Sequence, residues 1–81
     1  MYDPKEQVNF TQSDQYLIVD QTEKAANAIY DLCDFDGRIK QTGYLDEQGK
    51  AKIDISKILQ GRYQLFVINE GSIFKSVITI K

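Results

Sequence analysis

The segment at residues 53–67 constrains the fold more than any other part of this chain. It reads as a short apolar strand at 53–55, a polar corner, and a second apolar strand that opens with Gly61 and Tyr63. Gly61 permits backbone angles that a side chain would forbid. Tyr63 can place its ring in a core while its hydroxyl bonds to nearby backbone. We therefore expect Gly61 and Tyr63 to hold a sharp corner between two strands.

The rest of the chain carries the alternation of apolar and polar side chains that is typical of β-strands. The one helix-friendly run, at 23–28, is too short to persist among such neighbours. We expect strands at residues 7–11, 15–20, 26–35, 38–45, 51–55, 62–69 and 72–80. Together with a corner that resembles the tyrosine corner of immunoglobulin-like folds, these strands predict an all-β, immunoglobulin-like antiparallel β-sandwich of about seven strands. Residues 7–81 would form this single domain, and residues 1–6 a flexible tether.

Three of the expected strands, at 26–35, 62–69 and 72–80, are apolar on both faces. Such strands are either covered on both sides or present an outer face to another protein. Long basic side chains such as Arg62 could instead lay their stems over the outer apolar atoms. If the outer face binds protein, the interface residues are expected to be Ile29, Phe66 and Ile68. A homodimer through this sheet face is one form that such an interface could take.

The composition argues against catalysis, cofactor binding and nucleic-acid binding. The chain has no histidine and one cysteine, which leaves no zinc ligand set and no histidine to activate a nucleophile. Ten basic and twelve acidic residues give a net charge of −2, without the basic footprint that nucleic acid requires. Cys33 lies in an apolar alternation and is expected to be a buried hydrophobe. No apolar run approaches the ~18 residues of a membrane-spanning helix, so we expect no membrane insertion.

The expected hairpin near residue 36 contains several acidic side chains. Asp36 and Gly37 predict a tight turn in which they are the two central residues, both with positive φ. Asp31, Asp34 and Asp36 suggest a calcium loop, because calcium needs several converging oxygen ligands. Their spacing does not fit an EF-hand loop, and on a strand Asp31 points away from Asp34 and Asp36. A solvated hairpin tip without a metal is therefore the better interpretation.

Several runs of the chain follow one another in an order that is known from a bacterial family. They are Ala28-Ile29-Tyr30-Asp31-Leu32, Asp36-Gly37-Arg38-Ile39, Ile53-Asp54-Ile55-Ser56, Leu59-Gln60-Gly61-Arg62-Tyr63-Gln64-Leu65 and Lys75-Ser76-Val77-Ile78-Thr79-Ile80-Lys81. This order resembles the C-terminal sorting domain of the type IX (Por) secretion system of Gram-negative bacteria. Those domains typically show a "YDLxGR" strand and turn, an "IDLSxLxxGxYxL" corner and a basic final strand. The resemblance spans residues 26–81.

The resemblance implies an immunoglobulin-like sandwich that is appended to secreted cargo and read by an outer-membrane translocon. Gly61 and Tyr63 would form the corner, and Lys75, Ile78, Ile80 and Lys81 would belong to the terminal strand that the secretion machinery reads. The expected function is a non-catalytic C-terminal sorting and attachment module of a secreted or cell-surface protein that is exported through the periplasm. A stand-alone secreted immunoglobulin-like adhesion or ligand-binding domain of a Gram-negative bacterium is the alternative.

Overall fold

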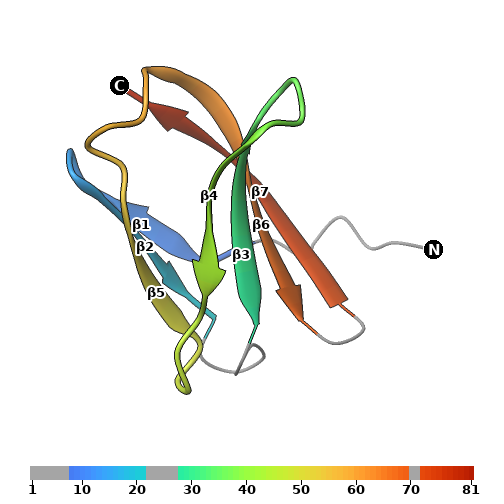
Figure 1. The fold of residues 1–81 in the computed structure, drawn as a ribbon. Coiled ribbons are helices and arrows are strands. Elements are labelled where there is room, and N and C mark those ends of the chain that lie inside the picture. Colours follow the sequence, from blue (N-terminus) through green and yellow to red (C-terminus); the bar gives the residue numbers. More distant parts are fainter. Residues whose placement is uncertain (1–7, 22–27, 70–71) are drawn as a thin grey trace.

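The computed structural model describes residues 8–21, 28–69 and 72–81. These ranges contain seven β-strands and no helix, hence no helix that could cross a membrane. The strands are β1 (Phe10–Gln12), β2 (Tyr16–Asp20), β3 (Ile29–Asp34), β4 (Ile39–Tyr44), β5 (Lys50–Asp54), β6 (Gly61–Asn69) and β7 (Ser72–Ile80) (Figure 1). Each of the seven expected segments overlaps one of them, and β1, β5 and β6 each extend one residue beyond the expected bounds. The expected tether at 1–6, and residues 7 and 26–27 of the expected strands, lie outside the described residues.

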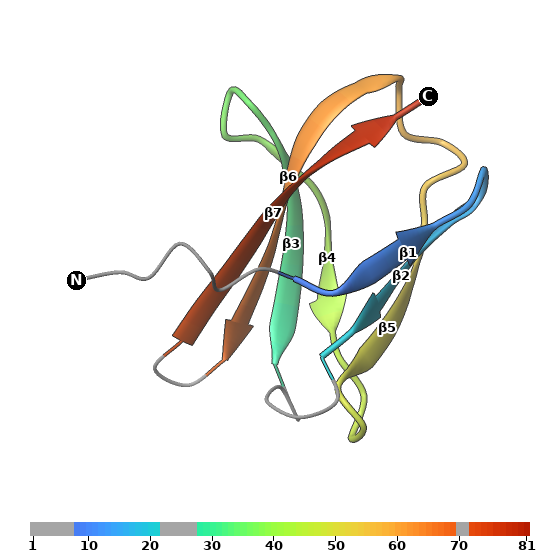
Figure 2. The same ribbon diagram turned by 180° about the vertical axis from the view of Figure 1, so that it is seen from behind.

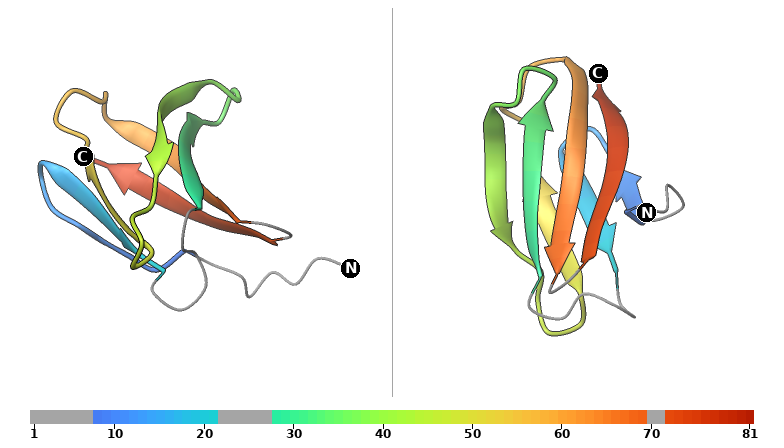
Figure 3. Two further views of the ribbon diagram at one scale, coloured as in Figure 1. Left: turned by 60° about the horizontal axis from the view of Figure 1, so that its bottom comes forward. Right: turned by 90° about the vertical axis from the view of Figure 1, so that its right-hand side faces the viewer.

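The strands form two antiparallel sheets, ordered β1-β2-β5 and β4-β3-β6-β7. The four-stranded sheet lies in front of the three-stranded sheet in the right panel of Figure 3, so the molecule has two layers. The chain changes layer between β2 and β3, between β4 and β5, and between β5 and β6. This is the expected immunoglobulin-like sandwich, in which hairpins alternate with connections that cross between the sheets.

The core lies between the two sheets and is made of the inward-facing half of each alternation. On β6, Tyr63, Leu65 and Val67 are buried, while their neighbours on the opposite face are half-buried or exposed. A strand that buries every second side chain against a facing sheet removes apolar surface from water. This burial stabilises the folded state by about 25 cal/mol per Å². The largest fully buried side chains come from both layers: Leu17, Val19 and Ile53 from one sheet, Leu32, Leu65 and Val67 from the other.

Tyr30 packs against a glycine on the neighbouring strand. Tyr30 and Gly43 are directly opposite each other on β3 and β4. A Cβ atom at residue 43 would lie 2.8 Å from Cε2 of the Tyr30 ring, closer than real Cβ contacts allow. Gly43 therefore leaves the space in which the buried ring lies, and burial raises the pKa of the Tyr30 hydroxyl.

Side chains join the two sheets along both open sides of the sandwich. Gln41 of β4 donates from Nε2 to the carbonyl of Asp54 on β5 at 2.8 Å, and Gln12 of β1 donates to the carbonyl of Thr79 on β7 at 2.8 Å. The Ser76 hydroxyl of β7 accepts a bond from the backbone N–H of Val8 (3.0 Å), just before β1, and donates one to its carbonyl (3.3 Å). Figure 2 shows the side of the sandwich on which β1 and β7 lie. These bonds connect sheets that share no backbone ladder.

The β3–β4 hairpin corrects the expected turn. Gly37 N–H donates to the Asp34 carbonyl, so Phe35 and Asp36 are the central residues, and Gly37 follows them with φ +87°. The Asp34 carboxylate accepts the backbone N–H groups of Asp36 and Arg38, both at 2.9 Å. The expected pair, Asp36 and Gly37, was wrong because an aspartate that caps the turn from position 34 displaces its centre by one residue.

The turn before β5 repeats this arrangement. Asp46 accepts the backbone N–H groups of Gln48 and Lys50, and Gly49 takes φ +80° three residues after the aspartate. The common pattern is aspartate, two variable residues, glycine and a basic residue, at 34–38 and at 46–50. This repeated pattern was the sequence signal for both turns.

Candidate binding surface

Gly61 and Tyr63 lie where the chain passes from β5 of one sheet to β6 of the other (Figure 1). The Tyr63 hydroxyl donates to the carbonyl of Leu59 at 2.7 Å, and the side chain is only 5% exposed. Gly61 has φ +148°, which disfavours any side chain, although a Cβ atom would have ordinary contact distances there. The structure thus contains the expected bond from the tyrosine to upstream backbone, and the role of this pair is to build the corner.

Of the four residues that the resemblance assigns to the terminal strand, two are buried and two are exposed. Ile78 and Ile80 point into the core and are buried, whereas Lys75 and Lys81 are exposed. In the folded protein a partner could therefore reach the two lysines and the outward side chains of β7, but not the two isoleucines.

The outer face of the four-stranded sheet consists of three rows of side chains that run across all four strands. The pairing register places Tyr44, Ile29, Ile68 and Ile73 in the first row, Thr42, Asp31, Phe66 and Lys75 in the second, and Ile39, Cys33, Gln64 and Val77 in the third. We call these twelve residues the outer sheet face. It includes the three expected interface residues, Ile29, Phe66 and Ile68, on its two central strands.

The outer sheet face holds most of the exposed large apolar side chains in the described part of the chain. Seven such side chains are exposed there; four lie on the outer sheet face and a fifth, Phe35, at the tip of the adjoining hairpin. Tyr44 is 78% exposed. The outer face of the other sheet carries charges of both signs, such as Lys52, whose Nζ lies 4.1 Å from the centre of the Tyr16 ring. The two faces of the sandwich therefore differ in character.

Basic side chains cover a small part of this apolar surface. Lys75 Nζ lies 5.8 Å from the centre of the Phe66 ring, and the Arg62 guanidinium carbon lies 5.2 Å from the centre of the Phe35 ring. Both contacts are within the range of weak cation–π attraction. No such contact covers Tyr44 within the described residues. Tyr44, the most exposed side chain of the first row, is therefore accessible to a partner.

Cys33 lies in the third row, between Ile39 and Gln64, and is buried, as expected for a small hydrophobe. Burial raises the pKa of its thiol, and the negative charges of Asp31 and Asp34 raise it further. The thiol is therefore held in its protonated, weakly nucleophilic form.

Three aspartates, Asp34, Asp46 and Asp54, accept backbone N–H groups of residues that follow them in turns. The backbone N–H of Arg38 lowers the pKa of Asp34, and the hydroxyl of Ser56 lowers that of Asp54. The ion pair between Lys40 Nζ and Asp34 Oδ2, at 3.7 Å, also lies beside the β3–β4 turn. Within ranges 8–21, 28–69 and 72–81, no three cysteine or acidic side chains lie close enough to share a metal ion.

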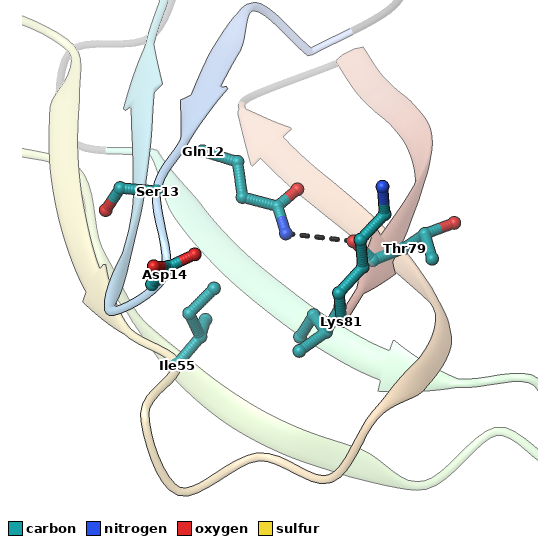
Figure 4. Close-up of a pocket in the computed structure, with 7 residues that line it drawn as sticks. Gln12, Ser13, Asp14, Ile55, Thr79 and Lys81 are labelled. Atoms are coloured by element: carbon teal, nitrogen blue, oxygen red, sulfur yellow. Dashed lines mark hydrogen bonds between the residues drawn. The ribbon is translucent and has the colours of Figure 1, made fainter.

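A shallow pocket of about 300 Å³ lies between the β1–β2 turn and the end of β7. Its lining includes Gln12, Ser13, Asp14, Ile55 and Lys81, and the bond from Gln12 to the Thr79 carbonyl spans it (Figure 4). The pocket is polar and open, and its amide is engaged in joining the two sheets. It lacks the apolar lining and convergent polar groups of a small-molecule site.

Comparison of the chain with protein-family models and with curated proteins gives no match. The resemblance to sorting domains therefore depends on the residues quoted above.

The outer residues of β4 and β7 are the part of the surface that the sequence analysis missed. Tyr44, Ile39, Ile73 and Val77 flank the three expected interface residues in the same rows. The alternation of apolar and polar side chains along each strand indicates which of its side chains share the outer face. Only the pairing register shows that they continue the rows that begin on β3 and β6.

Proposed function

We propose that this chain is a non-catalytic protein-binding module that serves in sorting and attachment of a secreted or cell-surface protein, and that the outer sheet face is its recognition surface. The observation that carries the proposal is the concentration of exposed apolar side chains on one side of the sandwich. A contiguous exposed apolar patch on a small domain marks an interaction surface, because a partner that covers it gains the free energy of burial.

The terminal hairpin supplies half of this surface. Phe66, Ile68, Ile73 and Val77 all belong to β6 and β7, the strands that the resemblance to sorting domains points to. Lys75 adds a positive charge in the middle of these apolar residues. Secretion machinery that reads the folded sandwich would therefore contact the hairpin by its outward side chains, during export through the periplasm.

A stand-alone adhesion or ligand-binding domain is the second candidate function. The observation in its favour is that the apolar surface extends beyond the terminal hairpin to Tyr44 on β4, the most exposed side chain of the first row. A module that binds a ligand with the whole sheet would use Tyr44, whereas recognition of the hairpin alone would not.

The test is export of a reporter enzyme fused to this chain, in a Gram-negative bacterium with a type IX secretion system. The informative variant is Val77→Asp, with Ile18→Asp on the opposite sheet as its matched control. The two side chains are exposed to similar degrees, 46% and 41%, on outer faces of different sheets. We expect surface display of the reporter to fall at least fivefold for Val77→Asp and to be unchanged for Ile18→Asp.

Removal of the last residues should also abolish display, but this truncation deletes Ile78 and Ile80 from the core and can act by unfolding. The Val77→Asp substitution is therefore the decisive test of the sorting role. Equal display of the wild-type and Val77→Asp fusions would refute a sorting role for the outer sheet face. Undiminished display accompanied by loss of binding to a glycan or protein array would support the second candidate instead.

A further inference from the structure

We propose that the partner of the outer sheet face is a second copy of this chain, packed face to face about a two-fold axis that runs along β6. This inference rests on the proposed function in that it takes the outer sheet face as a protein-binding surface, and it concerns the purified chain in the absence of the secretion machinery. It is carried by the distribution of charge in the second row of the outer sheet face.

The second row is symmetric about β6 in position and opposite in charge. Asp31 on β3 and Lys75 on β7 are both paired with Phe66, one on each side. Within one copy they do not pair with each other, because the ion pair in the described part of the chain joins Lys40 and Asp34. The Asp31 carboxylate accepts a hydrogen bond from the neutral Thr42 hydroxyl at 2.7 Å, which leaves its charge without an opposite charge. Asp31 and Lys75 stand two strands apart, on the order of 10 Å.

A two-fold axis along β6 turns this arrangement into a self-complementary surface. The rotation places β3 of one copy opposite β7 of the other, at the same row. Asp31 then faces Lys75 of the second copy, Lys75 faces its Asp31, and the two Phe66 rings meet at the axis. An isologous interface requires this kind of exchange, in which residue i meets j and j meets i.

The neighbouring rows are compatible with the same axis. In the first row Ile29 faces Ile73 of the second copy, and Ile68 faces its own counterpart. In the third row Cys33 faces Val77. Packed sheets cross at about 30°, which moves the two Arg62 side chains, near one end of β6, away from each other.

The alternative axis, between β3 and β6, is electrostatically worse. It would place Asp31 against Phe66 of the second copy and Lys75 against its Thr42, with neither charge paired. Burial of a charge that faces no opposite charge is unfavourable, so the observed charges select the axis along β6.

The area available fits a weak dimer. Three facing strands span about 14 Å in width and roughly 20–30 Å in length, so each copy contributes roughly 300–400 Å² of sheet plane. The relief of the side chains, together with Tyr44 at the flank, brings the total accessible surface buried to on the order of 1,000 Å², at the lower end of specific interfaces. We therefore expect a dissociation constant in the micromolar range.

The test is sedimentation equilibrium of the purified chain between about 10 µM and 1 mM, with the variants Asp31→Lys and Lys75→Asp. Each variant alone places two like charges opposite each other, and we expect each to weaken self-association at least tenfold. An equimolar mixture of the two restores both opposite-charge pairs, and we expect it to form a heterodimer. Ile18→Asp, on the other sheet, should associate as the wild type does, and thermal melts of each variant verify folding.

A wild-type chain that is monomeric at 1 mM would overturn the proposal, and so would a mixture that associates no better than its two components. A monomeric wild type combined with loss of display in Val77→Asp would leave the proposed function intact and assign the face to a different protein. A heterodimer combined with normal display of Val77→Asp would support the second copy and refute the sorting role.

Discussion

The corner at Tyr63 allows a sharp test of how this small sandwich is stabilised. Tyr63→Phe removes the hydroxyl that donates to Leu59 at 2.7 Å and leaves the buried ring in place. A hydrogen bond of this kind contributes about 0.5–1.5 kcal/mol to the free energy of unfolding. We therefore expect a loss of roughly 1 kcal/mol.

Tyr63→Ala removes the ring as well and leaves a cavity in the core. Truncation of a buried aromatic side chain costs about 3–5 kcal/mol. A domain of 81 residues has a free energy of unfolding near the lower end of about 5–15 kcal/mol, so this variant can lose most of its stability. Tyr63→Phe stays folded and keeps the reasoning testable.

Equilibrium unfolding in urea, followed by far-ultraviolet circular dichroism, measures both variants. With a slope of about 1 kcal/mol per M, Tyr63→Phe should lower the urea midpoint by roughly 1 M. Tyr44→Phe and Tyr44→Ala are the controls, because Tyr44 is exposed, and both should stay within about 0.5 kcal/mol of the wild type. A midpoint for Tyr63→Phe equal to that of the wild type would show that the hydroxyl bond does not stabilise the corner, and a small effect of Tyr63→Ala would refute the corner as a core anchor.

Three further predictions follow from single contacts. Gly43→Ala should destabilise the protein by about 1–3 kcal/mol, because its Cβ meets the Tyr30 ring, and the penalty should shrink in a Tyr30→Leu background when both are measured by urea unfolding. The pKa values of Asp34 and Asp54 are lowered in the fold, so their stabilising contribution is present above the ordinary carboxyl pKa of 3.8 and is lost as the pH falls through the lowered values. The double variant Asp34→Asn, Asp54→Asn should therefore lose less stability than the wild type between pH 5 and about pH 2. Cys33, with its raised pKa, should react with a thiol reagent at pH 8 at least tenfold more slowly in the native protein than in urea.

Each of these predictions has an outcome that contradicts it. Equal penalties for Gly43→Ala in the two backgrounds would show that the Tyr30 ring is not what the new methyl group meets. Parallel acid-unfolding curves for the wild type and the aspartate double variant would show that the two turn carboxylates do not contribute to acid sensitivity. Equal thiol reaction rates in native and unfolded protein would place Cys33 at an open surface.

The sequence by itself determined the local structure of this protein. Alternation identified all seven strands and the inward-facing side chains of β6, because a strand places successive side chains on opposite faces whatever its neighbours are. The pair Gly61 and Tyr63 identified the corner for a similar reason: the glycine angles and the bond to Leu59 involve residues at most four apart. The turn at Asp34 to Gly37 was equally local, and its repeated pattern at 46–49 would have predicted both turns.

Only the tertiary structure decided which outward side chains form one surface. The row of Tyr44, Ile29, Ile68 and Ile73 exists because three separate strand pairings share one register, and a slip of one residue in any of them would break it. The order of strands in a sheet decides that Asp31 and Lys75 flank Phe66. Register and strand order depend on contacts between residues far apart in the chain, and periodicity along a single strand carries no information about them.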